Sequence, residues 1–251
     1  MDQNSSKMSS KNGFQKITMI EDNYLDNLIT EKLLASQENR EPSGKLSASK
    51  LYWPVQWQVL ATVFKMKSNI DDYTLRKFQR GKDVEDWFIK QIEPKEKQKF
   101  LEYRGVIGFC DSVVDTAKWD NPVGIITLEV KSITNMAFKW LDKEGAKKGH
   151  IIQNAFYAMA MNVDYHAITY IASDDYRINT YILETKDSKD EIEKIIDEFE
   201  KAVESKTIPV FEPREKWMSD LKYNNFPEFA GLSAQELQEK FIQLNEVSKN
   251  S

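Results

Sequence analysis

Apolar residues recur along this chain with helical spacing in some stretches and with the spacing of strands in others. Helical spacing predicts helices over residues 24–34, 51–64, 73–92, 147–161 and 189–205. Short apolar runs bounded by turn-forming residues predict strands over residues 100–109, 112–116, 123–133, 167–172 and 178–184. From residue 73 onward the order is helix, three strands, helix, two strands, helix. This order predicts an α/β fold with a central mixed β-sheet flanked by α-helices.

The chain of 251 residues is long enough for one substantial core with appendages. We expect a weakly structured or helical arm over residues 1–45, a main domain over 46–212 and a helical extension over 213–251. The longest apolar runs fall well short of the roughly 20 residues that a membrane span needs, so we expect no membrane partner. A polar N-terminus and a single cysteine, Cys110, predict a cytoplasmic protein.

The formal net charge of -5 argues against a protein that binds nucleic acid over its whole surface. The charge is unevenly distributed, however. Residues 131–150 contain five lysines against two acids, whereas the predicted last helix is strongly acidic. A local basic groove is therefore compatible with the overall charge.

Glu129 and Lys131 close an apolar strand, and this context distinguishes them from the other acid-x-Lys sequences in the chain. Alternation along a strand places both side chains on one face, with Val130 on the other. Opposite charges then converge at the end of a strand. The alternative is an exposed ion pair between neighbouring strands.

Asp111 lies 18 residues before Glu129, on the preceding predicted strand. Neighbouring strands can bring the two carboxylates together, and a pair of carboxylates with carbonyl and water oxygens suits Mg²⁺. Asp115 is either a further ligand or a turn acid, and the sequence leaves both open. Gln153 and Tyr157 share one face of a predicted helix, where they are either a functional pair or buried polar residues with satisfied hydrogen bonds.

Together these residues resemble the RecB-like branch of the PD-(D/E)XK nuclease superfamily, which includes the lambda-type phage exonucleases. Four segments carry the resemblance and cover about residues 76–185. They are Gly-Lys-Asp-Val-Glu at 81–85, Gly-Phe-Cys-Asp at 108–111, Glu-Val-Lys at 129–131 and Gln-Asn-Ala-Phe-Tyr at 153–157. The resemblance implies a restriction-endonuclease-like core.

The resemblance also implies roles for these positions. Asp111, Glu129 and the carbonyl of Val130 would bind the metal, Glu85 would complete or bridge a second metal position, and Lys131 would orient or help deprotonate the attacking water. Mg²⁺ is the expected ion, with Mn²⁺ as the alternative. The histidine that many relatives have near the position of Glu85 is missing here, and the cysteines that hold an iron–sulfur cluster in several relatives are absent. We therefore expect no iron–sulfur cluster.

DNA is the implied partner, and a homo-oligomer or a recombination protein is a further candidate partner. Gln153 and Tyr157 would hold the strand through its phosphates. The cations expected to assist them are Lys147, Lys148 and Arg80, although runs of charge are more often solvated surface. Trp140, flanked by lysines, is a candidate for stacking on a base.

The sequence thus predicts a metal-dependent DNA nuclease, an exonuclease of recombination, repair or phage DNA processing. Two alternatives stay open. One is a non-catalytic nucleic-acid-binding module on the same fold, because fold does not fix function. The other is a restriction-type endonuclease.

Overall fold

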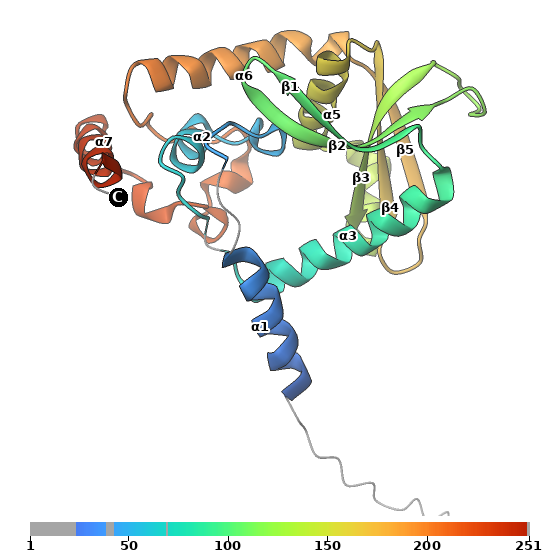
Figure 1. The fold of residues 1–251 in the computed structure, drawn as a ribbon, viewed down its shortest axis with the longest axis horizontal. Coiled ribbons are helices and arrows are strands. Elements are labelled where there is room, and N and C mark those ends of the chain that lie inside the picture. Colours follow the sequence, from blue (N-terminus) through green and yellow to red (C-terminus); the bar gives the residue numbers. More distant parts are fainter. Residues whose placement is uncertain (1–23, 39–42, 69, 250–251) are drawn as a thin grey trace, which may run out of the picture.

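A five-stranded mixed sheet forms the centre of the structure, a computed structural model that describes residues 24–38, 43–68 and 70–249. The strands follow one another in the order in which they occur along the chain. They are β1 (Glu96–Tyr103), β2 (Val106–Asp115), β3 (Ile125–Ile133), β4 (Tyr165–Ala172) and β5 (Ile178–Glu184). Only β3 and β4 are parallel, and the other neighbouring pairs are antiparallel. The predicted α/β fold with a mixed sheet is confirmed (Figure 1).

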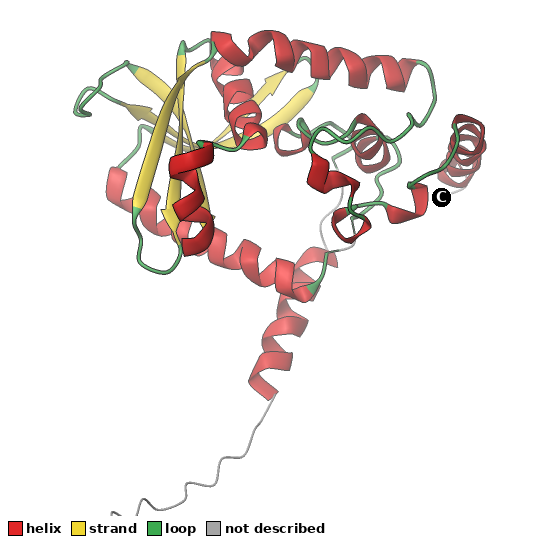
Figure 2. Cartoon of the chain, turned by 180° about the vertical axis from the view of Figure 1, so that it is seen from behind, coloured by secondary structure: helices red, strands yellow, loops and turns green. Residues whose placement is uncertain are grey.

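Helices cover both faces of the sheet (Figures 1 and 2). The helices are α1 (Tyr24–Glu38), α2 (Val55–Thr62), α3 (Asp72–Ile92), α4 (Asn135–Glu144), α5 (Lys148–Met161), α6 (Lys186–Glu204) and α7 (Ala234–Lys249). Short 3-10 turns are found at Ala48–Lys50, Lys216–Ser219, Leu221–Tyr223 and Pro227–Phe229. Helix α3 packs Val84 and Phe88 against one face of the sheet, whereas α5 and α4 cover the other.

Successive side chains of β3 point to opposite faces of the sheet, so its charged residues and its core residues lie on different faces. Ile126, Leu128 and Val130 are buried in the cluster beneath α3. Glu129 and Lys131 therefore project from the opposite face, where their β4 partners belong to or adjoin the cluster beneath α4. The expectation that alternation places these two charged side chains on one face is confirmed.

Most predicted elements are confirmed, but three predictions on the N-terminal side and in the middle of the chain were wrong. The strand predicted over residues 100–109 is the middle of a hairpin, in which Arg104 and Gly105 turn the chain with positive φ. Apolar residues on both sides of that turn conceal it in the pattern. The strand predicted over 112–116 is the second half of β2 rather than a separate element.

The helix predicted over residues 51–64 begins later, at Val55, because Pro54 precedes it and a proline disfavours helical backbone at the residue before it. Helix α4 was not predicted. Thr134 caps it by accepting a hydrogen bond from Ala137 N, and its ten residues bury only Leu141 fully, so the apolar stripe is short.

A second cluster of apolar residues lies away from the sheet, where α2 meets the C-terminal part of the chain. Trp57 and Leu60 of α2 pack with Met218, Phe226 and Leu237. The residues predicted as an extension therefore build their core on a helix from the predicted main domain. The arm predicted over 1–45 lies partly outside the described residues, and its described helix α1 contacts α3 (Figure 1).

Within the described part of the chain, no helix combines the length and the apolar character needed to cross a membrane.

His166 makes the stability of the fold depend on pH. Its side chain is buried on β4, and neither ring nitrogen has a hydrogen-bond partner among the described residues. Burial lowers the pKa of His166 to about 4. Because the folded pKa lies below the unfolded value of about 6.5, the stabilisation is complete above that value and is lost as the pH falls towards 4.

We expect His166→Leu to remove part of this dependence. Between pH 7 and pH 5 the free energy of unfolding should fall by about 2 kcal/mol more in the wild type than in the variant. Urea unfolding of both proteins at the two pH values measures the difference, and other titrating groups cancel in the comparison. Equal pH dependence of the two proteins would show that His166 is not the responsible group.

Candidate metal and nucleic-acid site

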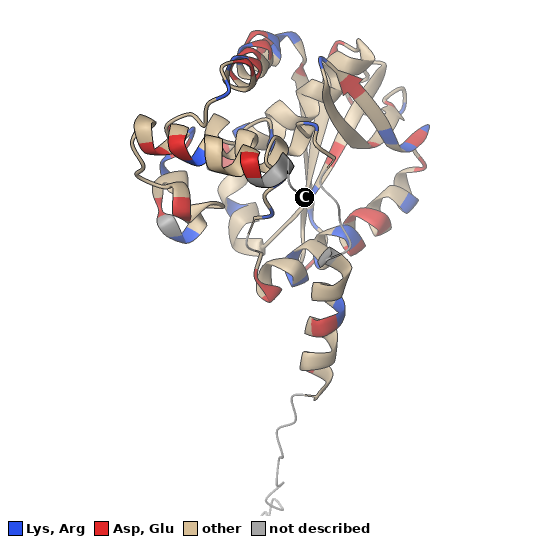
Figure 3. Cartoon of the chain, turned by 60° about the vertical axis from the view of Figure 1, so that its left-hand side comes forward, with Lys and Arg blue, Asp and Glu red and all other residues tan. Residues whose placement is uncertain are grey.

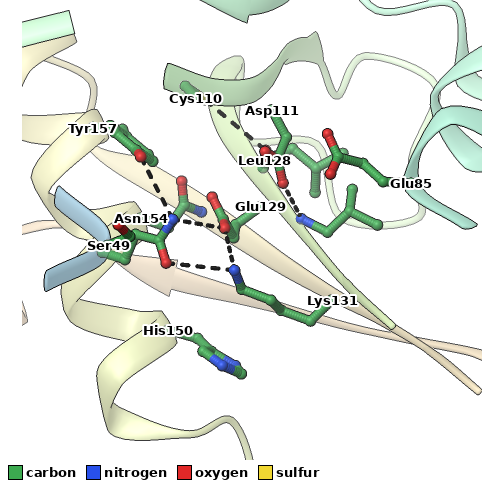
Figure 4. A network of polar contacts seen from close by, with 12 residues as sticks. Ser49, Glu85, Cys110, Asp111, Leu128, Glu129, Lys131, His150, Asn154 and Tyr157 are labelled. Carbon is green, nitrogen blue, oxygen red and sulfur yellow. Dashed lines mark hydrogen bonds and ion pairs between the residues drawn. The ribbon is translucent and has the colours of Figure 1, made fainter. Parts of the chain in front are cut away.

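The sheet opens between β2 and β3 at Asp111. Their ladder ends with the pair Ser112 and Leu128. At the next position the Asp111 carboxylate takes the place of a backbone partner, because its Oδ2 accepts a hydrogen bond from Val130 N at 2.8 Å. The two strands separate beyond this point, and the opening beside Asp111 and Glu129 is called the fork. Figure 4 shows the two carboxylates next to each other there. The two carboxylates expected to meet are brought together.

Glu129 is held by two donors on the same oxygen. Its Oε1 accepts from Lys131 Nζ at 2.5 Å and from Gln153 Nε2 at 2.8 Å. The other oxygen, Oε2, is buried and has no hydrogen-bond partner among the described residues. The residue is only 1% exposed. A buried carboxylate oxygen without a partner is costly, so this atom is available to a further donor or a cation.

Glu85 reaches the site from α3, on the other side of the sheet. The open ladder lets a side chain from α3 approach carboxylates that belong to the fork. Glu85 Oε1 accepts a hydrogen bond from Gln98 Nε2 at 2.7 Å. Burial, followed by repulsion from Glu129, raises the pKa of Glu85 above its ordinary value. Figure 4 shows the Glu85 carboxylate beside that of Asp111.

Negative charge is concentrated in this site. Burial, together with repulsion from Glu129 and Glu85, raises the pKa of Asp111 well above its usual range. Burial alone would lower the pKa of Lys131, but the carboxylates, Glu129 foremost, raise it above its ordinary value. The carboxyl groups therefore favour the charged ammonium of Lys131, and one ammonium faces three carboxyl groups.

The donor set fits a hard divalent cation. No group of three or more His, Cys, Asp or Glu side chains among the described residues forms a metal site by itself. Mg²⁺ is normally bound by one or two carboxylates together with water and substrate oxygens. The free Oε2 of Glu129 and the adjacent Asp111 carboxylate provide such a pair, and the carbonyl of Val130 lies on the same strand between Glu129 and Lys131.

Gln153 and Tyr157 project from α5 towards these groups, as their spacing predicts. Besides its bond to Glu129, Gln153 makes longer contacts from Oε1 to Lys131 Nζ at 3.4 Å and from Nε2 to Tyr157 Oη at 3.5 Å. Tyr157 is buried, and burial raises the pKa of its phenol above its ordinary value. This chain of polar contacts joins α5 to the end of β3.

The cations proposed for DNA binding are less favourably placed than Gln153 and Tyr157 for contacting a phosphate at the fork. Lys148 pairs with Glu191 of α6, so its ammonium is directed away from the fork. Arg80 is exposed, and five residues of helix place it roughly 140° around α3 from Glu85. Lys147 is exposed at the start of α5, and its backbone N–H is bonded to Tyr170 Oη. Along α3 a basic stretch, residues 76–82, is followed by an acidic stretch, residues 83–86 (Figure 3).

The structure shows the surroundings of two residues whose roles the sequence left open. Asp115 is exposed, pairs with Lys95 at 3.0 Å and accepts a hydrogen bond from Ala117 N, which makes it a turn acid. Trp140 is half exposed on α4 with the Lys143 ammonium 5.3 Å from its ring centre. Among the described residues, the polar contacts of Asp115 and Trp140 do not include Asp111, Glu129 or Glu85.

Sequence reasoning missed two residues that shape the site. Gln98 looks like one more polar residue in a lysine-rich stretch, and no pattern marks it. Asn154 neighbours Gln153, and its Nδ2 donates to the carbonyls of Thr127 and Ala167 on adjacent strands. An asparagine in the apolar face of a predicted helix was the only available signal for the second residue.

No known protein-family model and no curated protein matches this sequence. Among solved structures, the crystal structure of SSO0001 is similar at 15% identity with a TM-score of 0.54, over 83% of this chain and 98% of that one. An alkaline exonuclease from Laribacter hongkongensis is 17% identical with a TM-score of 0.49, over 70% and 93% of the two chains. A phage-related exonuclease from Haemophilus somnus 129PT is 16% identical with a TM-score of 0.46, over 64% and 94%. The likeness to SSO0001 shows a shared fold and nothing finer.

Gly108 permits the close approach of α5 to β2. A Cβ at this position would lie 2.7 Å from Tyr157 Cε1 and 2.9 Å from Ala48 Cβ, so both neighbours would have to move. A Cβ at Gly81, in contrast, would meet nothing within 4 Å.

We expect Gly108→Ala to lower the free energy of unfolding by about 1 to 3 kcal/mol through overpacking. Gly81→Ala, on an open helix surface, should raise it by up to about 1 kcal/mol. Urea unfolding of the two variants beside the wild type measures both changes. A Gly108→Ala protein as stable as the wild type would contradict the tight contact with Tyr157.

Proposed function

We propose that this protein is a metal-dependent deoxyribonuclease of the PD-(D/E)XK type, acting as an exonuclease. The observation that carries the proposal is the fork between β2 and β3. It gathers Asp111, Glu129 and Lys131 within one polar network and leaves a buried Glu129 oxygen without a hydrogen-bond partner in the described part of the chain. Two carboxylates and an ammonium in this arrangement suit phosphodiester hydrolysis, which needs a cation, an oriented water and neutralisation of charge.

In this proposal Asp111, Glu129 and the Val130 carbonyl hold Mg²⁺, with Mn²⁺ as the alternative, and Glu85 completes or bridges a second position. A bound magnesium ion would lower the pKa of a water molecule and neutralise charge on the phosphate. Lys131 and Gln153 both occupy Oε1 of Glu129, which keeps Oε2 available. Their hydrogen bonds also fix the rotamer of the carboxylate.

Besides holding Glu129, Lys131 would orient the attacking water at the scissile phosphate. Its ammonium stays charged because the carboxylates raise its pKa, and its remaining N–H groups can donate to the attacking water. The water oxygen forms a bond to phosphorus and releases a proton to solvent. The bond from phosphorus to the leaving oxygen breaks, and the leaving oxygen takes up a proton from solvent. Products with a 5′-phosphate and a 3′-hydroxyl are what the family resemblance implies.

The same electrostatics disfavour a role limited to DNA binding. Without a cation the three carboxylates would repel a phosphate placed at the fork, since like charges at short range are unfavourable. A protein that only binds DNA gains nothing from a cluster of carboxylates at this position. A restriction-type endonuclease would use the same residues, and only the form of DNA that is cut separates it from an exonuclease.

We expect Mg²⁺ to support release of nucleotides from linear DNA, and Asp111→Asn and Lys131→Met to reduce the rate at least about 100-fold. Asp115→Asn is the matched control, because it removes an exposed carboxylate of the same strand outside the polar network. A nuclease assay on linear and closed-circular DNA, with Mg²⁺, Mn²⁺ or a chelator, measures these rates.

The two DNA substrates and the two metals separate the candidate functions. Digestion of linear DNA with closed circles left intact supports the exonuclease, whereas cutting of closed circles would indicate an endonuclease. DNA binding without cleavage under either metal would indicate a non-catalytic module. Equal loss of activity in Asp115→Asn would show that the fork is not the site of chemistry.

The crowded carboxylates should also cost stability when no metal is present. We expect Asp111→Asn to raise the free energy of unfolding in chelator by about 1 kcal/mol, because a neutral amide oxygen can still accept from Val130 N. Mg²⁺ at about 100 times its dissociation constant should stabilise the wild type by about 2.7 kcal/mol and the variant far less. Thermal unfolding with chelator or with Mg²⁺ tests both statements. A destabilised variant in chelator would contradict the repulsion.

A further inference from the structure

Gln98 has an unusual backbone in the middle of β1. Its φ is 47°, in the left-handed region that residues other than glycine enter at a cost of roughly 1 to 3 kcal/mol. Its neighbours on both sides keep their ladder pairs with β2, but Gln98 has none. The register places it opposite Asp111. The distortion therefore lies directly beside the fork.

The other residues with this backbone have ordinary explanations. Among the described residues, the remaining positive-φ positions other than glycine lie at helix ends, in turns or in loops between elements. They are Lys65, Glu93, Arg104, Asn162, Tyr176 and Lys206. Only Gln98 lies within a strand. A hairpin can curve without such strain, so its location calls for a reason connected with the site.

The side chain supplies that reason. From β1 the Gln98 amide spans to α3, and its Nε2 donates to Glu85 Oε1 at 2.7 Å. Glu85 faces repulsion from Glu129 and has solvent available along the exposed flank of α3. Repulsion from Glu129 therefore disfavours the inward position of this carboxylate. The amide of Gln98 offers a neutral donor that holds it inward without neutralising its charge.

We propose that Gln98 is a positioning residue, which holds the Glu85 carboxylate beside Asp111 through the strained backbone of β1 and the amide hydrogen bond. The inference rests on the proposed function, because it assigns Glu85 to the metal site. Gln98 itself touches neither metal nor substrate. Its effect should appear in the affinity for metal, and relief of the backbone strain should not destabilise the fold.

Two variants separate the side chain from the backbone. Gln98→Gly relieves the strain and removes the amide, whereas Gln98→Met keeps the length and the strain but removes the donor. Lys206→Gly is the matched control, because it relieves a positive φ of 51° on the exposed surface after α6. Thermal unfolding, calorimetry with Mg²⁺ and the Mg²⁺ dependence of DNA cleavage are measured for all four proteins.

We expect both Gln98 variants to bind Mg²⁺ about 10-fold more weakly than the wild type, in the range found for residues that orient metal ligands. The Gly variant should unfold at a temperature equal to or above that of the wild type, and the Met variant at or slightly below it. Lys206→Gly should bind Mg²⁺ as the wild type does. On a Glu85→Gln background, Gln98→Gly should cause no further loss, since the partner is already changed.

The outcomes distinguish the two proposals. If the wild type binds Mg²⁺ and cleaves DNA while both Gln98 variants match it, the positioning role is wrong and the nuclease stands. If the variants lose affinity equally on the wild-type and Glu85→Gln backgrounds, Gln98 does not act through Glu85 and the inference is also overturned. A wild type that neither binds Mg²⁺ nor cleaves DNA overturns both proposals.

Discussion

The hydrogen bond from Val130 N to the Asp111 carboxylate is the interaction on which the candidate site depends. In an uninterrupted sheet that N–H would bond to a backbone carbonyl of the neighbouring strand. Here a side chain replaces the carbonyl, so the strands can separate without leaving a buried donor unpaired. The same bond that permits the fork also places a carboxylate inside it.

The fork lets residues from both sides of the sheet meet. Helix α5 contributes Gln153 and Tyr157 from one face, and α3 contributes Glu85 from the other. In a closed sheet the strands would separate these two groups. Asn154 fastens α5 to β3 and β4 just beside the opening, so the open ladder is supported by polar contacts to its neighbours.

The negative and positive groups in the site do not balance. Three carboxyl groups face one ammonium, and burial together with their mutual repulsion raises the pKa values of Asp111 and Glu85. Such repulsion is a cost to the folded chain that a cation would remove. Around it, the fold uses ordinary means of stabilisation, such as the Arg104 guanidinium, which ties the tip of the β1–β2 hairpin to Glu193 and Asp197 of α6.

The sequence by itself determined the mixed α/β fold, the face shared by Glu129 and Lys131, and the shared face of Gln153 and Tyr157, because the periods of strands and helices are local properties. It did not reveal the turn at Arg104, since apolar residues flank it on both sides, nor helix α4, whose buried stripe is short. Only the tertiary structure decided that the β2–β3 ladder ends beside Asp111, that Lys148 turns towards Glu191, and that Gln98 reaches Glu85. Each of these depends on contacts between residues distant in sequence, which no local pattern encodes.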